Sequence, residues 1–202
     1  VKICKNNKQL VLFAGVNPNK TKKVLKEELM NIKKLGFRGI KLHPRLSNFY
    51  LDHNNLPFIL KECERLNLVL MLCCYNIIGF NKFSNQDFLV LLNKMFRKIN
   101  RLKTILMHGG CTRILEFSEF VKLRPNNFLL DLSMTLMRYS GSSIDMDIKY
   151  LFKTFDERIC IGSDFPEYSL KDTKQKFLKL SKGLNAKKIN NIAYKNLENF
   201  LK

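Results

Sequence analysis

The sequence is poor in the features that mark several classes of protein. Its 202 residues contain no tryptophan, only three histidines and five prolines. They contain no uninterrupted run of about 18 apolar residues, the length that a membrane-spanning helix needs, so we expect no transmembrane helix and no membrane partner. The first residues, Val1 to Asn7, include no apolar signal-peptide core, and the chain does not begin with methionine. We therefore expect it to be a piece of a longer gene product.

Acidic residues are scarce. The sequence has 17 Asp and Glu against 36 Lys and Arg, which gives a formal net charge of +19 at pH 7. Such a charge is typical of proteins that bind the phosphates of nucleic acids. However, no nucleic-acid-binding motif accompanies it, and many of the lysines are scattered along two predicted helices, so we favour an ordinary solvated surface and expect no nucleic-acid partner. These lysines are Lys22, Lys23, Lys26, Lys33, Lys34, Lys171, Lys174, Lys176, Lys179 and Lys182.

The cysteines form no Cys-x-x-Cys pair, which excludes the common redox and zinc-ribbon motifs. Several lie in apolar runs, where cysteine behaves as a small buried hydrophobic residue. Two of them are adjacent, which disfavours a disulfide between them. A reducing cytoplasm is therefore the simplest compartment. The six cysteines are Cys4, Cys63, Cys73, Cys74, Cys111 and Cys160.

Short apolar runs alternate with longer amphipathic stretches along the whole chain. With 46% hydrophobic residues, we expect residues 1–202 to form a single domain with a large core. The alternation predicts an α/β fold of six β/α units with a parallel sheet and right-handed crossovers. The predicted strands cover Leu10–Ala14, Gly39–Leu42, Leu68–Leu72, Thr104–Met107, Phe128–Leu132 and Ile159–Ile161. The predicted helices cover Lys20–Leu35, Leu56–Leu66, Asn85–Asn100, Thr112–Leu123, Ser143–Phe155, Leu170–Ser181 and Asn185–Leu201.

Two of the predicted strands end in residues that bear chemistry. His108 follows the strand Thr104–Met107 and precedes two glycines, and Asp164 lies just past the strand Ile159–Ile161. In α/β folds the loops at the carboxyl ends of the strands converge on one mouth, where active sites are built. An imidazole and a carboxylate on such strand ends are the groups that an acid–base pair or a metal site uses.

These segments carry a resemblance. MHGG at Met107–Gly110 and IGSDFP at Ile161–Pro166 resemble the sixth- and eighth-strand motifs of the amidohydrolase-related family (amidohydrolase 2) of metal-dependent hydrolases. Three further matches occur in the same order, at Gly36–Pro44, at Asn127–Ser133 and around Asn196 in Asn191–Leu197. The resemblance implies a (β/α)8 TIM-barrel-like fold. Since a complete barrel needs about 250 residues, the fold is expected to be incomplete, with the first strand here corresponding to about the third.

The resemblance also implies a divalent metal, zinc, and a metal-activated water. His108 matches the family's sixth-strand histidine, which serves as a base or helps to orient the attacking water, and Asp164 matches its eighth-strand metal ligand. The family's first-strand His-x-His pair is absent from the 202 residues, and Cys73 stands at the position of its fifth-strand histidine. The implied metal ligands are therefore Asp164, His108 and Cys73. A thiolate can bind zinc, but a buried, inert Cys73 is the alternative, and the metal is then lost from this chain.

Other polar residues near strand ends allow two interpretations each. His43 and Lys41 are candidate substrate-binding residues, the first as a group at the mouth and the second as a partner for a substrate carboxylate. The alternatives are a histidine that caps its own strand and a lysine that extends to solvent. Asp131 either buttresses His108 or orients a substrate, or it caps the following segment. Gly109 and Gly110 either let the backbone approach a ligand or form a plain tight turn.

The sequence as a whole favours an enzyme that acts on a small molecule. We expect metal-dependent hydrolysis of a small cyclic ester or amide, or decarboxylation of a small carboxylic acid, with His108 and Asp164 as the catalytic residues. A non-catalytic relative that kept the scaffold and lost the site is the second interpretation, and a basic nucleic-acid-binding protein is the third. A homo-oligomer is compatible with the sequence.

Overall fold

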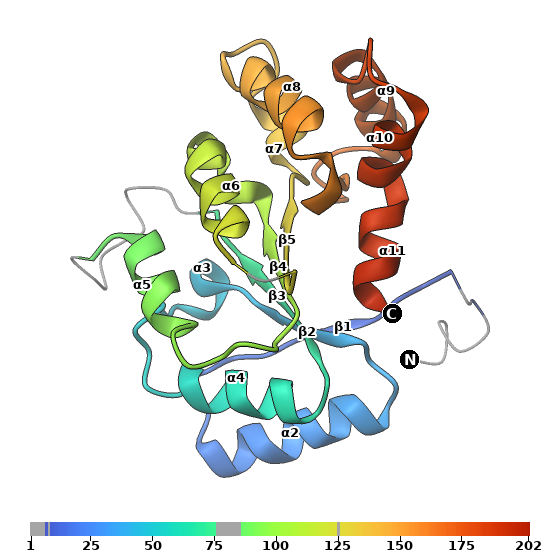
Figure 1. Ribbon diagram of the computed structural model, residues 1–202. Helices are drawn as coiled ribbons and strands as arrows, with labels where there is room; N and C mark the ends of the chain where they lie inside the picture. The colour runs from blue at the N-terminus through green and yellow to red at the C-terminus, as the bar shows by residue number, and fades with distance from the viewer. Residues whose placement is uncertain (1–6, 8, 76–85, 125) are drawn as a thin grey trace. The chain divides into compact units, whose positions relative to one another are not determined.

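The computed structural model describes residues 7, 9–75, 86–124 and 126–202 and has an α/β fold (Figure 1). Its six strands follow one another in the sheet in chain order. The pairs β1–β2, β2–β3 and β5–β6 are parallel. The predicted fold class is therefore confirmed. The strands are β1 (Phe13–Gly15), β2 (Gly39–Leu42), β3 (Val69–Cys73), β4 (Thr104–Met107), β5 (Phe128–Asp131) and β6 (Ile159–Cys160).

Helices connect the strands. The α-helices are α2 (Lys22–Lys34), α3 (Pro44–Ser47), α4 (Leu56–Arg65), α5 (Phe88–Met95), α6 (Ile114–Lys122), α7 (Thr135–Arg138), α8 (Ile144–Thr154), α9 (Leu170–Leu180), α10 (Ala186–Asn190) and α11 (Asn196–Leu201). Short helical turns of other types are η2 (His108–Arg113), η3 (Asp156–Arg158) and the π-turn η4 (Asn191–Lys195). Within the described residues, no helix is long and apolar enough to cross a membrane.

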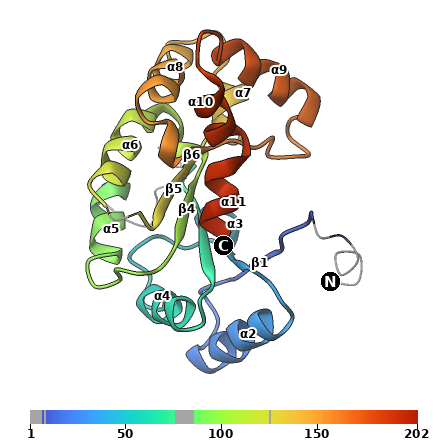
Figure 2. The ribbon, with the colours of Figure 1, turned by 45° about the vertical axis from the view of Figure 1, so that its right-hand side comes forward.

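The chain divides into two compact units, Val1–Thr104 and Ile105–Lys202. In the first unit, α2 lies beside α4, as Figures 1 and 2 show. Leu25 and Leu29 of α2 and Ile40 of β2 are fully buried, because their helical and strand spacings place them on the core side. Gly39 is required where β2 meets β3, since a Cβ there would lie 2.0 Å from the Val69 carbonyl oxygen.

The second unit packs α6 and α8 against each other and sets α9 beside α7 and α8. Its core contains large aromatic side chains: Phe117 of α6, Phe128 of β5 and Phe152 of α8 are almost completely buried. Phe152 also meets Phe177 of α9 edge to face, with ring centroids 5.6 Å apart. This aromatic contact connects α8 and α9, the helices that precede and follow β6 in the chain.

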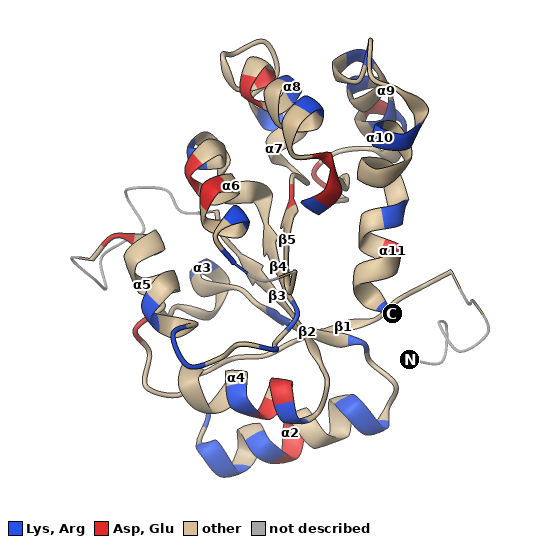
Figure 3. Ribbon diagram, in the orientation of Figure 1, with Lys and Arg blue, Asp and Glu red and all other residues tan. Residues whose placement is uncertain are grey.

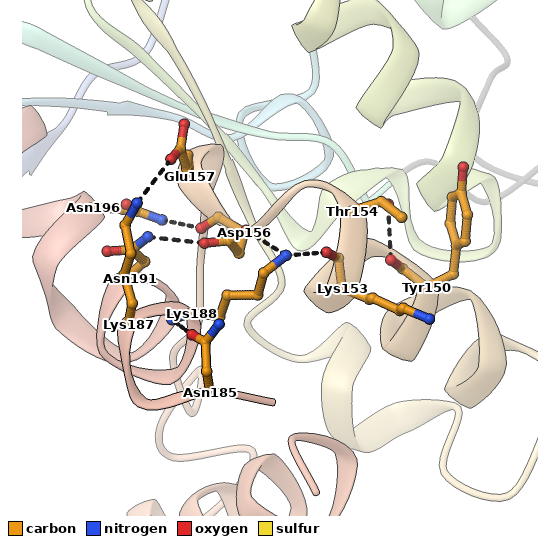
Figure 4. Close-up of polar contacts among 10 residues, drawn as sticks. All are labelled: Tyr150, Lys153, Thr154, Asp156, Glu157, Asn185, Lys187, Lys188, Asn191 and Asn196. Carbon is orange, nitrogen blue, oxygen red and sulfur yellow. Dashed lines mark hydrogen bonds and ion pairs between the residues drawn. The ribbon is translucent and has the colours of Figure 1, made fainter. Parts of the chain in front are cut away.

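The terminal helices are joined to the segment that leads into β6. Asn196 donates from Nδ2 to the backbone oxygens of Asp156 (2.6 Å) and Ile159 (2.7 Å), and Asn191 Nδ2 donates to the Asp156 carboxylate (2.8 Å). Lys188 lies 3.2 Å from the same carboxylate. Figure 4 shows these groups converging on Asp156. The contacts fix the start of β6, and with it the segment that carries Asp164.

Several predicted boundaries change in the structure. The helix predicted at Lys20–Leu35 is α2, shortened because the Thr21 side chain accepts a hydrogen bond from the Val24 amide and caps it. The helix predicted from Thr112 begins only at Ile114, because Gly109, Gly110 and Cys111 have positive φ angles. The single helix predicted at Asn185–Leu201 is interrupted by the π-turn η4. The short helices α3 and α7 have no counterpart in the prediction.

Two expectations fall partly outside the described residues. Cys4 lies among residues 1–6, and Asn85, the predicted start of a helix, lies among residues 76–85. The described part of that helix, α5, begins at Phe88, where the Asp87 carboxylate caps it by accepting from the amides of Leu89 and Val90. It ends at Met95, short of the predicted Asn100.

Candidate active site

His108 follows β4 and is held at its ring and at both backbone polar groups. Its side chain is buried, and its Nδ1 lies 3.0 Å from the Ser133 carbonyl oxygen. A carbonyl oxygen only accepts, so Nδ1 carries the proton and the lone pair of the neutral ring is on Nε2. The His108 amide donates to Asp131 Oδ2 (3.4 Å), and its backbone oxygen accepts from the Thr135 hydroxyl (2.6 Å).

Asp131 and Ser133 form the other side of this arrangement. Two residues apart at the end of β5, they point to the same side of the chain. Both are buried, and Asp131 accepts hydrogen bonds from the Ser133 amide (3.1 Å) and from the Ser133 hydroxyl. Asp131 thus contacts the loop that carries His108. Of the roles that the sequence left open for Asp131, this contact supports the one in which it buttresses His108. The contributions of the Ser133 carbonyl and the Thr135 hydroxyl were missed, although the spacing of Asp131 and Ser133 could have indicated a shared face.

Burial dominates the electrostatics of this site. It raises the pKa of Asp131, against the lowering effects of the Ser133 hydrogen bonds and of His108. Burial also raises the pKa of Cys160 well above its usual value, and the Asp131 carboxylate, whose Oδ1 lies 3.9 Å from the sulfur, adds to this shift. Cys160 is therefore a thiol, which donates to Asp131 and does not act as a nucleophile.

Residues with uncommon backbone conformations in the second unit lie just after the ends of strands. Among the described residues of this unit, four other than glycine have positive φ angles: His108 (64°) and Cys111 (59°) after β4, Met134 (62°) after β5 and Asp164 (56°) after β6. Such conformations cost about 1–3 kcal/mol each and cluster at functional sites. The two sequence-predicted catalytic residues are thus both held in uncommon backbone conformations.

The turn after His108 is shaped by packing. At Gly110, where φ is 72°, a Cβ would lie 2.1 Å from the Phe117 ring of α6. At Gly109 a Cβ would lie 2.7 Å from Leu132 Cδ2. Both glycines therefore serve a tight, closely packed turn, the simpler of the two interpretations made from the sequence.

Asp164 is half-buried in the segment between β6 and α9. Its backbone oxygen accepts from the Glu167 amide (3.0 Å), and the neighbouring Ser163 hydroxyl accepts from the Phe165 amide (3.2 Å). A cavity of about 370 Å³ adjoins the start of this segment. Most of its lining is apolar; it consists of Ile161, Gly162, Ser163, Leu170, Thr173, Lys174, Phe177, Leu178, Ile189 and Ala193.

The other predicted site residues belong to the first unit. His43 caps the following helix α3, since its Nδ1 accepts from the Leu46 amide (3.3 Å), and not its own strand as the alternative interpretation had it. Lys41 lies within β2 and is half-buried. Cys73 is the last residue of β3 and is buried, and Cys74 donates from its thiol to the Leu72 carbonyl oxygen (3.4 Å). All five cysteines in the described residues are buried, and none of these five forms a disulfide.

The predicted metal centre does not assemble from the described residues. No three or more His, Cys, Asp or Glu side chains among them are grouped so that they could hold a metal ion. A catalytic zinc site needs three protein ligands in fixed geometry. Asp164, His108 and Cys73 therefore stay a proposed ligand set, with Cys73 in the first unit and the other two in the second, and no chemical step is assigned to a metal here.

Comparison with known proteins identifies relatives. The sequence matches the family profile described as amidohydrolase over residues 1–196. A comparison with curated protein sequences gives no match.

Solved structures share the fold. A TIM-barrel protein of Bordetella bronchiseptica, itself uncharacterised, superposes with a TM-score of 0.82 at 19% identity, over 99% of this chain and 69% of that chain. A 2,6-dihydroxybenzoate decarboxylase in complex with 2,6-dihydroxybenzoate gives 0.69 at 18% identity, over 99% and 73%. A candidate 2-pyrone-4,6-dicarboxylic acid hydrolase of Pseudomonas putida gives 0.60 at 16% identity, over 95% and 70%. At these identities the likeness concerns the fold: the six strands form an incomplete TIM barrel.

Proposed function

Because the chain belongs to the amidohydrolase family, we propose that it is a hydrolase or decarboxylase of a small carboxylic acid or a small cyclic ester or amide. Two of its structural neighbours are named for such substrates, a dihydroxybenzoate and a pyrone dicarboxylate. The observation that carries the proposal is the geometry of His108, a buried imidazole fixed in one tautomer at a strained strand end.

His108 is the general base in this proposal. With its proton on Nδ1, the neutral ring takes a proton from water or substrate at Nε2. The Ser133 carbonyl oxygen holds the ring in one orientation throughout, because Nδ1 is a donor both in this neutral tautomer and in the charged ring. The buried Asp131 carboxylate, which accepts from the His108 amide, favours the imidazolium that forms. A positioned base of this kind contributes roughly 10²- to 10⁴-fold to a rate.

Asp164 is proposed as the second catalytic group. Its carboxylate would shuttle a proton during the reaction and would also hold a metal. Its support is its position after β6 and its uncommon backbone conformation. Lys41 and His43 remain proposed substrate contacts. Cys73 remains a proposed metal ligand, and zinc the proposed metal. Because the described residues do not form a three-ligand group, the proton chemistry assigned to His108 stands without a metal step.

The test compares turnover of 2,6-dihydroxybenzoate and 2-pyrone-4,6-dicarboxylate, followed by liquid chromatography, in the wild type and in His108→Gln. We expect the substitution to lower kcat/KM at least 100-fold. The matched control is His53→Gln, whose Nδ1 only accepts from the Asn55 amide in a turn of the first unit and should leave turnover unchanged. Equal activity of His108→Gln and wild type would remove His108 from the mechanism.

A non-catalytic relative is the second candidate. Two features favour it: the 202 residues contain no His-x-His pair, and a buried cysteine, Cys73, stands where the family places a histidine. In that case neither compound is turned over by the wild type, with or without added zinc. Nitrogen-15 NMR of the histidine rings still reports the His108 tautomer, so the geometry is checked separately from the activity.

A further inference from the structure

A basic hollow opens on the second unit, between the carboxyl-terminal parts of α8 and α9. Its volume is about 680 Å³. Lysines make up four of its seven lining residues, and none of the seven is acidic. The lining comprises Lys149 and Lys153 of α8, then Lys179, Leu180, Lys182, Gly183 and Leu184 at the end of α9 and in the following turn. The hollow shares no residue with the candidate active site.

Three other lysines of this unit have carboxylate partners. Lys176 pairs with Asp145 at 2.6 Å, Lys188 with Asp156 at 3.2 Å and Lys187 with Glu157 at 3.8 Å. In the described part of the chain, by contrast, no ion pair is found for the four lysines of the hollow.

Asp145, whose pKa is affected by a lysine of the hollow, is already paired with another lysine. The charge of Lys149 contributes to lowering the pKa of Asp145. The Asp145 carboxylate, however, accepts directly from Lys176 and from the Gly141 amide. The backbone oxygen of Lys153 accepts a hydrogen bond from the Lys188 ammonium, while Figure 4 shows the Lys153 side chain extending away from Asp156. The hollow therefore keeps its positive charge.

Helix dipoles account for only part of this arrangement. Lysines are favoured in the last turn of a helix, and Lys153 and Lys179 occupy such positions. Lys149 lies more than one turn before the end of α8, and Lys182 lies beyond the end of α9. Figure 3 shows basic residues on both helices. Four ammonium groups around one hollow repel one another unless an anion lies between them.

The frame of the hollow is fixed by contacts outside it. The Lys176–Asp145 ion pair and the edge-to-face contact of Phe152 with Phe177 both join α8 to α9. Lys149 and Lys153 on α8 are therefore held at a set spacing from Lys179 at the end of α9 and Lys182 in the following turn. Lysine is a compact point charge that suits phosphate oxygens.

We propose that this hollow binds a small polyanion with several phosphate groups. It is a second site, independent of the proposed catalytic activity. The hollow's volume is within the usual range for small-molecule sites, about 300–1,000 Å³. No aromatic side chain lines it, which disfavours a single-stranded nucleic acid, since such partners stack their bases on aromatic rings.

The test uses sodium tripolyphosphate as the probe and isothermal titration calorimetry at low and at physiological salt. The variant carries Lys149→Gln, Lys153→Gln, Lys179→Gln and Lys182→Gln. We expect this variant to bind tripolyphosphate at least tenfold more weakly. The pair Lys149→Gln and Lys153→Gln alone, or the pair Lys179→Gln and Lys182→Gln alone, should lower the affinity about threefold. The matched control removes the same net charge from α2 and α4 of the first unit, by Lys22→Gln, Lys23→Gln, Lys34→Gln and Lys61→Gln, and should stay within twofold of wild type.

A second measurement needs no variant. In the wild-type protein, tripolyphosphate should protect Lys149, Lys153, Lys179 and Lys182 from amine acetylation and leave Lys171 reactive, as read by mass spectrometry. Three results overturn the proposal: an equal loss of affinity in the control variant, no binding by the wild type, or tighter binding of single-stranded RNA that depends on the same four lysines. Circular dichroism establishes that each variant is folded.

Discussion

At the scale of single residues, charge and burial decide what each group does. Asp131 is buried and its pKa is raised, whereas Asp145 has a lysine partner and its pKa is lowered. Burial acts on both carboxyls in the same direction. At Asp145, the hydrogen bond from Lys176 and the Gly141 amide, together with the nearby lysine charges, outweighs it. The two residues therefore respond to pH in opposite ways.

The Asp145–Lys176 pair predicts a pH-dependent contribution to stability. A lowered folded-state pKa adds stability above the unfolded pKa of about 3.8, and this stability is lost as the pH falls through the folded value. We expect Asp145→Asn to lower the free energy of unfolding by about 1 kcal/mol at pH 7 and by progressively less below pH 4. Urea unfolding at several pH values measures this. The control is Asp52→Asn at an exposed site, and a difference that stays constant with pH would contradict the assignment.

At the scale of elements, the turn between β4 and α6 determines where His108 lies. Its conformation combines positive φ angles with close packing against Phe117. The Thr135 hydroxyl at the start of α7 and the Asp131 carboxylate at the end of β5 hold the same turn. The position of the candidate base is thus shared among several elements of the second unit.

Gly110→Ala tests this turn. The added Cβ meets the Phe117 ring at 2.1 Å and an unfavourable φ of 72°. Gly183→Ala is the matched control, because its φ of 89° is equally unfavourable while nothing lies within 4 Å of the added Cβ. We expect a loss of about 3 kcal/mol in the free energy of unfolding for Gly110→Ala and about 1 kcal/mol for Gly183→Ala. Equal losses in urea unfolding would mean that Phe117 moves aside at little cost.

The terminal helices give a second prediction at this scale. Asn196→Asp replaces a donor to two backbone oxygens with a carboxylate that only accepts, so the oxygens of Asp156 and Ile159 lose their partner. We expect a loss of about 2–3 kcal/mol in thermal or urea unfolding. Asn199→Asp, at an exposed position of α11, should change stability little. If the two variants are equally stable, the terminal helices do not fix β6.

The sequence predicts the elements better than the details of the site. The strands β2 and β4 agree with the predicted ranges to the residue, because continuous apolar runs with clear ends form them. His108 and Asp164 lie just past their strands, as the motifs indicated. The positive φ angles of His108 and Met134 could not be predicted, since residues other than glycine seldom adopt them; at His108, tertiary hydrogen bonds to Asp131 and Thr135 hold the backbone in this conformation. The π-turn at Asn191 likewise depends on distant contacts with Asp156.

At the scale of the whole molecule, Asp131, Ser133 and Thr135, which hold His108, belong with it to the second unit and supply the contact that fixes its tautomer and the buried carboxylate. The remaining predicted site residues, Lys41, His43 and Cys73, belong to the first unit. The prediction that residues 1–202 form one domain stays a prediction. Lys and Arg are spread over helices of both units, as Figure 3 shows, in keeping with a solvated basic surface.

Zinc content is the measurement that bears on the whole chain. A lasting catalytic zinc needs three protein ligands, and the described residues form no such group. We expect well below one zinc per molecule by elemental analysis of the 202-residue chain, and full occupancy after extension at the amino terminus by a strand that ends in His-x-His. Zinc missing from both proteins would favour the non-catalytic interpretation.

Cys73 can be tested in the same measurement. Cys63 is the matched control, because burial raises its pKa to about 12 and keeps it a thiol that does not bind metal. If the 202-residue chain carries one zinc that Cys73→Ser removes and Cys63→Ser leaves in place, the prediction of weak binding is wrong and Cys73 is a replacement for the family's histidine. If neither substitution changes a sub-stoichiometric content, Cys73 is a packing residue at the end of β3 and not a zinc ligand.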